Sequence, residues 1–336
     1  MKEAMLYEKL PGQRVHCFLC NHQCRIAEGK RGVCAVRENR AGTLYTLVYR
    51  RLISGNPDPV EKKPMFHFAP GSRSFSIATA GCNFRCDFCQ NYEISQMPRD
   101  ENRISGQDTA PEDVVAMAKK TGCRTIAYTY TEPTIYFEYA HDIARIACRE
   151  GLKNIFVTNG YMTEEALRAL HPHLHGANVD LKAFREEFYR SRCGAGLEGV
   201  LRSLRVMKEL GVWVEVTTLI IPGLNDSEEE LGELARFVAS LGKEVPWHIS
   251  RFHPTYRMLD RSPTSVRVLE RARKIGLEAG LRYVYTGNVP GDAGEDTFCP
   301  RCGNLLVDRL GFQILEYRIQ EEKCPKCGSA VDGVDL

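Results

Sequence analysis

The strongest constraint on the fold is an alternation of strand-like and helix-like segments between Phe75 and about Asn288. The strand-like runs are short and rich in β-branched and aromatic residues, whereas the segments between them are amphipathic with helical spacing. Alternation of this length predicts parallel strands joined by helical crossovers. The predicted strands are 75–80, 125–130, 154–159, 177–182, 212–221, 247–252 and 282–287.

The predicted helices have recognisable ends. One begins near Pro111 and stops at Gly122, the next ends at Gly151, and another begins at a capping box formed by Ser227 and Glu230. Six or seven strand–helix units favour a partial (β/α)6 barrel over a complete barrel of eight units, and a doubly wound open sheet is the alternative. Either fold places its chemistry at the carboxyl ends of the strands.

Composition limits the classes of function. The chain has 336 residues, with 45 basic and 43 acidic side chains and a net charge of +2. This balance argues against nucleic acid as a partner, because nucleic-acid surfaces need clustered positive charge. The first residues lack the apolar core of a signal peptide, and no apolar run approaches the roughly 20 residues of a membrane span. We therefore expect a cytoplasmic protein with no membrane partner.

The chain contains 14 cysteines, and most of them fall into groups near its start, its middle and its end. Closely spaced cysteines in a reducing compartment indicate metal ligands more often than disulfides. The groups suggest a cysteine-rich metal-binding region (1–70), the barrel (71–290) and a C-terminal ribbon (291–336). The groups are Cys17, Cys20, Cys24 and Cys34; Cys82, Cys86 and Cys89; and Cys299, Cys302, Cys324 and Cys327. The scattered Cys123, Cys148 and Cys193 are expected to be small buried residues.

The C-terminal group consists of two C-P-x-C-G knuckles, at 299–303 and 324–328. Four thiolates at this spacing predict a zinc ribbon, with rubredoxin-type iron as the alternative. Metal binding is part of folding in a module this small, so a structural role is expected.

The N-terminal group has the spacing C-x2-C-x3-C-x9-C, with His16 and His22 beside it. This spacing allows a structural zinc site or a second iron–sulfur cluster, and zinc is favoured by a small margin. The two interpretations differ in where the site lies. A cluster that relays electrons would approach the mouth of the barrel, whereas a zinc site need not.

The central group lies in the segment GCNFRCDFCQN (81–91), directly after the first predicted strand. Three thiolates would bind three irons of a four-iron cluster and leave one iron open, and an open position is typical of catalysis or ligand binding. The C-x3-C-x2-C spacing, with Phe88 before the last cysteine, resembles the hallmark of radical S-adenosylmethionine (SAM) enzymes.

The resemblance implies a cofactor and a chemistry. Cys82, Cys86 and Cys89 would bind a [4Fe-4S] cluster shielded by Phe88, and SAM would bind the open iron. In this family the cluster cleaves SAM reductively to a 5′-deoxyadenosyl radical, which abstracts hydrogen from a substrate. The cofactors supply the difficult chemistry, and the protein positions and shields them.

The resemblance extends to the ends of the later strands and implies residues that line the SAM site. The segment TYTEP (129–133) stands where the family has a glycine-rich turn that binds the SAM amino group, and TNG (158–160) and DLK (180–182) resemble segments of glycyl-radical-enzyme activases. The implied residues are Thr131, Glu132, Thr158, Asn159, Asp180, Lys182, Thr217 and His248.

Segments along nearly the whole chain, such as PVEKKPMFHFAPGS (59–72) and WHISRFHPTYRM (247–258), resemble the AmmeMemoRadiSam class of radical SAM proteins. Members of this class are described as homologues of the pyruvate formate-lyase activating enzyme. The resemblance implies an activating-enzyme-like oxidoreductase that acts on a glycyl radical enzyme-type protein or on a small molecule. It also implies an electron donor of the ferredoxin or flavodoxin type.

The alternative function is an iron–sulfur and zinc protein for regulation or electron transfer, without SAM chemistry. Such a protein has no use for polar side chains such as Glu132, Asn159, Asp180 and Lys182 that converge on an open iron. The strand ends therefore favour the enzyme.

Overall fold

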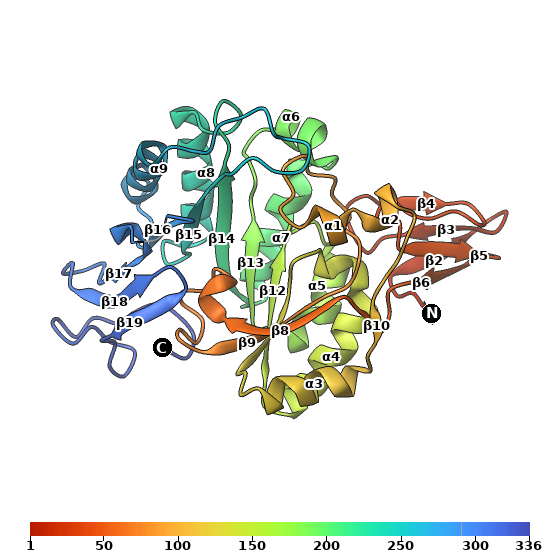
Figure 1. Ribbon diagram of the computed structural model, residues 1–336, viewed down its shortest axis with the longest axis horizontal. Helices are drawn as coiled ribbons and strands as arrows, with labels where there is room; N and C mark the ends of the chain where they lie inside the picture. Colours follow the sequence, from red (N-terminus) through yellow and green to blue (C-terminus); the bar gives the residue numbers. More distant parts are fainter. Residues whose placement is uncertain (290) are drawn as a thin grey trace.

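The computed structural model describes residues 1–289 and 291–336, and its centre is an eight-stranded sheet (Figure 1). The strand order is β16-β15-β14-β13-β12-β11-β9-β8, and every neighbouring pair from β9 to β16 is parallel. This confirms the predicted α/β fold with a mostly parallel sheet. The strands are β8 (Ser54–Pro59), β9 (Arg73–Ala78), β11 (Thr125–Tyr128), β12 (Lys153–Thr158), β13 (Gly176–Asp180), β14 (Trp213–Ile220), β15 (Trp247–Arg251) and β16 (Val284–Gly287).

All seven predicted strands lie in this sheet, and the last of them, β16, forms one edge. The other edge is β8, which was not predicted and pairs antiparallel with β9. The sequence of β8, SGNPDP, does not look like a strand because Pro57 and Pro59 cannot donate hydrogen bonds. Such residues are tolerated at the edge of a sheet, where β8 lies. The sheet thus begins at Ser54, and the predicted boundary at residue 290 lies outside the described residues.

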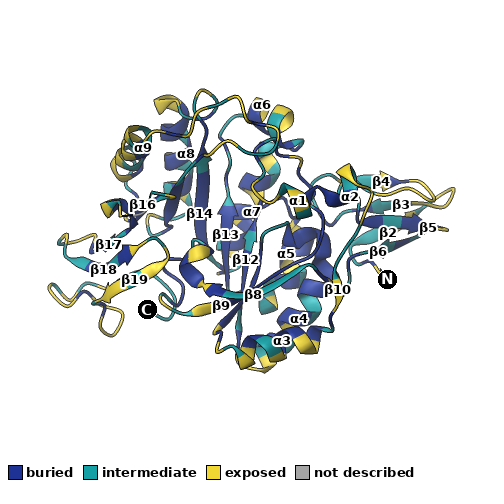
Figure 2. Cartoon of the chain, viewed as in Figure 1, coloured by how far each residue is buried: buried dark blue, intermediate teal, exposed yellow. Residues whose placement is uncertain are grey.

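Helices pack against the sheet, and Figure 2 shows the strands mostly buried while the helices expose one side. The longer helices are α3 (Pro111–Lys120), α4 (Phe137–Arg149), α5 (Glu164–Leu170), α7 (Leu197–Glu209), α8 (Glu228–Leu241) and α9 (Val266–Glu278). The shorter ones are α1 (Tyr92–Ser95), α2 (Met97–Asp100), α6 (Glu186–Phe188), a π-helix (Tyr189–Cys193) and 3-10 turns at Val60–Lys62, Pro133–Tyr136, His171–His173 and Ala293–Glu295. Within the described part of the chain, no helix has the length and apolar character needed to cross a membrane.

The predicted capping box at the start of α8 is half formed. Oγ of Ser227 accepts a hydrogen bond from the Glu230 backbone amide at 3.3 Å. The Glu230 carboxylate instead accepts from the backbone amide of Phe184 at 2.6 Å. The Glu230 side chain therefore binds the distant residue Phe184 in place of the Ser227 backbone amide that a complete capping box would use.

The first 52 residues form small antiparallel sheets at one end of the molecule, opposite the C-terminal ribbon (Figure 1). Their strands are only two to four residues long, so no alternation pattern is visible in the sequence. One sheet has the order β2-β3-β4, another has the order β1-β6-β5, and β7 pairs with β10. The strands are β1 (Lys2–Glu3), β2 (Tyr7–Leu10), β3 (Arg14–Cys17), β4 (Cys24–Ile26), β5 (Arg37–Arg40), β6 (Thr43–Thr46), β7 (Arg51–Leu52) and β10 (Gln107–Asp108).

The C-terminal ribbon is a three-stranded sheet of β17 (Thr297–Phe298), β18 (Leu305–Leu310) and β19 (Gln313–Tyr317). It is attached to the segment between β8 and β9. The Arg309 guanidinium lies 4.3 Å from the centre of the Phe66 ring, and the backbone amide of Ala69 donates to the Val334 carbonyl at 2.8 Å.

The segment between β8 and β9 also fills the inner face of the sheet near the amino ends of the strands. Val60, Met65 and Phe68 pack with Ala127 and Ile155 in one buried cluster. Buried side chains therefore occupy this end, and the carboxyl ends remain for a functional site.

His67, in the same segment, predicts a loss of stability in acid. Its Nδ1 lies 2.6 Å from the Asp332 carbonyl and its Nε2 lies 2.5 Å from Oη of Tyr285, a pattern that suits a neutral ring. Burial lowers the pKa of His67 to about 4, from its usual value of about 6.5. The unfolded chain binds the proton more tightly, so stability falls as the pH drops from about 6.5 towards 4.

We expect His67 to remove about 2 kcal/mol of unfolding free energy between pH 7 and pH 5. The measurement is urea unfolding at both pH values for the wild type and for His67→Gln. The variant should be less stable at pH 7 but should lose less on acidification. An equal loss in both proteins would contradict the assignment.

Candidate active site and its metal sites

The central cysteines lie on the loop that follows β9, at the carboxyl end of the sheet. The loop turns at Gly81, which has φ +109° and lies so close to the N-terminal region that an added Cβ would be 2.8 Å from Cγ1 of Val36. Arg99 fixes the loop by donating to the carbonyls of Cys82 and Phe84, each at 3.0 Å. Packing against a separate part of the chain thus sets the loop conformation.

The three thiols are partly or fully buried and have few polar neighbours. Sγ of Cys82 accepts from the Phe84 backbone amide at 3.3 Å, and Sγ of Cys89 lies 3.2 Å from Oγ of Ser95. Burial raises the pKa of the Cys82 and Cys89 thiols, and a hydrogen bond with Cys193 together with burial raises the pKa of Cys86. These thiols need a cationic partner, such as metal, to become thiolates.

The arrangement fits a cluster better than a single ion. Among the described residues, only the C-terminal cysteines bring three or more metal-ligating atoms within 4.8 Å of one another. The central sulfurs are therefore spread too widely for one tetrahedral ion, whereas a cluster binds each thiolate on a different iron. Nδ2 of Asn83 and Oγ1 of Thr79 are buried beside the loop without a partner within the described part of the chain, and both can serve a bound group.

Three of the predicted strand-end residues lie beside this loop. Nδ2 of Asn159 lies 3.8 Å from Sγ of Cys82 and donates to Oδ1 of Asn83 at 2.7 Å. Asp180 and Lys182 form an ion pair at 3.1 Å, and both are close enough to Cys86 for their charges to act on its pKa. The structure therefore brings residues from the ends of β12 and β13 to the cysteines. Phe88 joins them, since Nζ of Lys182 lies 5.9 Å from the centre of its ring.

Glu132 and its neighbours form a buried network next to the loop. One oxygen of Glu132 accepts from Oγ1 of Thr158 at 2.7 Å and from Thr134, and the other accepts from the Asn159 backbone amide at 2.8 Å. Thr131 donates to the Thr79 carbonyl at 2.8 Å. Glu132 is 1% exposed, so its carboxylate acts on the site by orienting Thr158 and Asn159.

Thr217 and His248 lie elsewhere, on the inner face of the sheet. Oγ1 of Thr217 donates to Asn178 at 2.8 Å, and Nε2 of His248 lies 2.6 Å from the buried carboxylate of Glu215. The same carboxylate accepts the backbone amides of Phe66 and His67. His248 is thus part of the contact between the sheet and the segment that fills it.

Sequence reasoning missed the role of Arg99 and the position of Cys193. Cys193 is fully buried in the π-helix, and its carbonyl accepts from the Arg85 backbone amide at 2.8 Å. Cys193 is buried, as predicted, and it also lies close enough to Cys86 to raise the pKa of that thiol. No spacing pattern could reveal this contact, because more than 100 residues separate the two positions.

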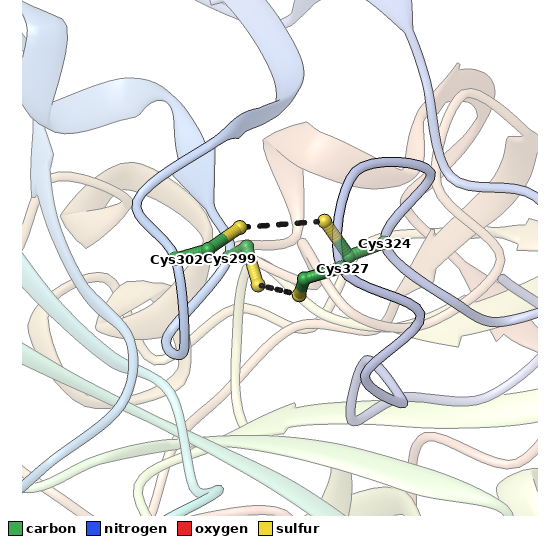
Figure 3. A group of neighbouring side chains, drawn as sticks. All are labelled: Cys299, Cys302, Cys324 and Cys327. Atoms are coloured by element: carbon green, nitrogen blue, oxygen red, sulfur yellow. Dashed lines mark hydrogen bonds between the residues drawn. The ribbon is translucent and has the colours of Figure 1, made fainter.

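The C-terminal cysteines form a compact four-sulfur site that could hold a metal ion (Figure 3). Two pairs of sulfurs, Cys299 with Cys327 and Cys302 with Cys324, are each 3.7 Å apart. A tetrahedral ion with metal–sulfur bonds of about 2.3 Å places its sulfurs about 3.8 Å apart. The geometry confirms that these knuckles meet at one site.

Comparisons with known proteins agree with this site. The sequence profile of the Radical SAM superfamily matches residues 76–238. An uncharacterised protein of Methanocaldococcus jannaschii is 46% identical over 335 residues, which cover 99% of each chain. The pyruvate formate-lyase-activating enzyme of Clostridium pasteurianum is 22% identical over 63% of this chain and 91% of that protein.

A solved structure supports the fold. The radical SAM methyltransferase of Sphaerobacter thermophilus superposes with a TM-score of 0.52 at 19% identity, over 68% of this chain and 71% of that one. The family profile runs from the second half of β9 through most of α8, and it includes the cysteine loop and the ends of β11 to β14. With its cysteine loop at the carboxyl end of a parallel sheet, the chain belongs to the radical SAM superfamily and is a radical SAM enzyme.

Proposed function

We propose that this protein is a radical SAM enzyme of the AmmeMemoRadiSam class, with its [4Fe-4S] cluster on Cys82, Cys86 and Cys89 and SAM at the open iron. The main support is that polar side chains from two strand ends lie beside these widely spaced cysteines. The side chains are Asn159, Asp180 and Lys182. When bound, the cluster and SAM together supply one-electron cleavage of a carbon–sulfur bond and an acceptor for a hydrogen atom.

The protein's own residues shape the site around these groups. Backbone amides of the cysteine loop donate to sulfur, as Phe84 does to Cys82, and such bonds tune a cluster's potential. Asn159 offers an amide, and Asp180 with Lys182 offers a charged pair at the mouth, where each can contact a polar ligand. Phe88 is 3% exposed and shields the loop from water.

We propose that the substrate is a polypeptide. This proposal is supported by the pyruvate formate-lyase-activating enzyme of Clostridium pasteurianum, which matches this chain over 91% of its own length at 22% identity. We also propose an electron donor of the ferredoxin or flavodoxin type, since such proteins deliver single electrons at low potential. Zinc is proposed for the C-terminal site, because its sulfur spacing of 3.7 Å suits one tetrahedral ion.

The test of this function is the production of 5′-deoxyadenosine and methionine from SAM by the reduced, anaerobically purified protein. We expect both products in equal amounts, together with an electron paramagnetic resonance signal that changes shape when SAM is added. A reduced-cluster signal that ignores SAM, with no product, would favour the regulatory or electron-transfer protein instead.

Replacing Glu132 with glutamine tests its positioning role. Glutamine keeps one acceptor oxygen but turns an NH2 group towards donors such as Thr158 and the Asn159 amide, so the network loses bonds. We expect SAM affinity to fall about tenfold, in the range typical of such supporting residues, while the iron content is unchanged. The measurement is SAM titration followed by electron paramagnetic resonance. Equal losses of SAM affinity and of iron would show that Glu132 supports the whole loop.

A further inference from the structure

The four N-terminal cysteines line a common cavity. Cys17, Cys20, Cys24 and Cys34 line one small cavity whose other walls are apolar apart from Arg37. Cys17 ends β3 and Cys24 begins β4, whereas Cys20 lies in the loop between these strands and Cys34 precedes β5. Nη1 of Arg37 donates to Sγ of Cys17 at 3.2 Å, so a cation already lies beside the sulfurs.

The N-terminal sulfurs are spaced differently from the C-terminal ones. The C-terminal sulfurs approach to 3.7 Å in pairs, as ligands of one ion do. In the N-terminal group, within the described residues, no three sulfurs lie within 4.8 Å of one another. The central cysteines, which belong to the cluster site of the family, share this wider spacing. A zinc ion would draw its four thiolates to about 2.3 Å and leave no cavity between them.

The cavity also lies next to the active-site loop. Nη2 of Arg99 donates to the carbonyls of both Val33 and Cys82, at 2.7 and 3.0 Å, so these two oxygens lie within about 6 Å of each other. Val33 precedes Cys34, so one guanidinium joins the two cysteine groups.

A second bridge links the same two loops. Nε2 of His22, between Cys20 and Cys24, lies 2.9 Å from the carbonyl of Asn83, the residue after Cys82. A cluster that relays electrons must lie near the mouth of the barrel, whereas a structural zinc site need not. The N-terminal cysteines lie near the mouth, which favours the cluster.

We propose that Cys17, Cys20, Cys24 and Cys34 bind a second [4Fe-4S] cluster that passes electrons to the cluster on the central loop. This proposal departs from the zinc site that the spacing of these cysteines in the sequence favours by a small margin. A ferredoxin-type donor reduces the N-terminal cluster from its 2+ to its 1+ state. That cluster returns to 2+ as the central cluster goes from 2+ to 1+, so one electron moves and no bond or proton changes. The relay rests on the proposed function, whereas the binding of the second cluster does not.

The test is metal analysis of the full-length, anaerobically reconstituted protein. We expect about eight iron atoms, because each of two clusters holds four, and about one zinc per chain. Cys24→Ala should lower the iron to about four and leave the zinc and the SAM-responsive signal in place. Cys148→Ala is the matched control, because Cys148 belongs to no cysteine group, and it should retain about eight irons.

The reduced Cys86→Ala protein supplies a second readout that does not depend on the fold of the N-terminal variant. It should show a four-iron signal that ignores SAM. About four irons with two zincs in the wild type, or about six irons from a two-iron cluster, would overturn the proposal. If the wild type holds eight irons but no signal responds to SAM, the second cluster stands and the proposed function fails.

Discussion

Replacing Cys86 with alanine is expected to reduce SAM cleavage by more than about 100-fold, because changes to residues that only support metal ligands already cost 10–100-fold. Cys86 is the most buried of the central cysteines, at 7% exposed, and its loss would leave two thiolates, too few to retain the central cluster. The measurement is 5′-deoxyadenosine formed by the reduced variant and by the wild type at matched protein concentration.

Two controls give this result its meaning. The metal proposed for the C-terminal cysteines should remain, because the ribbon strands β17, β18 and β19 lie apart from helix α1, which follows the cysteine loop (Figure 1). The double variant Cys86→Ala/Cys193→Ala should behave like the single one, which would exclude Cys193 as a substitute ligand. Loss of zinc together with the cleavage activity would mean that the variant disturbs the whole fold.

Much of the barrel could be predicted because its signals are local. The parallel strands are recognisable in the sequence as short runs rich in β-branched residues. All seven predicted runs overlap observed strands. The cysteine triplet is likewise one contiguous segment. The edge strand β8 could not be found, because Pro57 and Pro59 contradict strand propensity and are tolerated only through the position of β8 at the edge.

The arrangement of the candidate site was less accessible to sequence reasoning, because it depends on contacts between distant segments. Glu132 is surrounded by donors from Thr134, Thr158 and Asn159, and the sequence shows only that all four are polar. His248 faces Glu215, on the neighbouring strand, because both side chains point to the inner face of the sheet. Strand register determines such pairs, and register emerges only when the whole sheet is assembled.

The largest effect on stability is expected from Glu138→Gln, which leaves Arg37 unpaired in the core. The side chains of Arg37 and Glu138 form an ion pair and are 2% and 0% exposed. The same carboxylate accepts the Met5 backbone amide at 2.7 Å, so the pair joins α4 to the N-terminal sheets. Removing one partner of a buried pair costs about 3–5 kcal/mol, because the other charge stays buried without compensation. Urea unfolding of the metal-loaded protein measures this loss.

The double variant Arg37→Met/Glu138→Met distinguishes the cost of an unpaired buried charge from the loss of the hydrogen bonds that Arg37 makes. Apolar side chains of similar length remove both charges, and such replacements are often neutral or stabilising. We therefore expect the double variant to recover most of the stability that Glu138→Gln loses, while Glu150→Gln, at an exposed pair with Lys119, should leave the midpoint unchanged. If the double variant is as unstable as Glu138→Gln, the N-terminal region depends on the hydrogen bonds of Arg37 to Cys17 and Met5. Arg37 would then be needed as a donor to the sulfurs of the cavity rather than as a partner for Glu138.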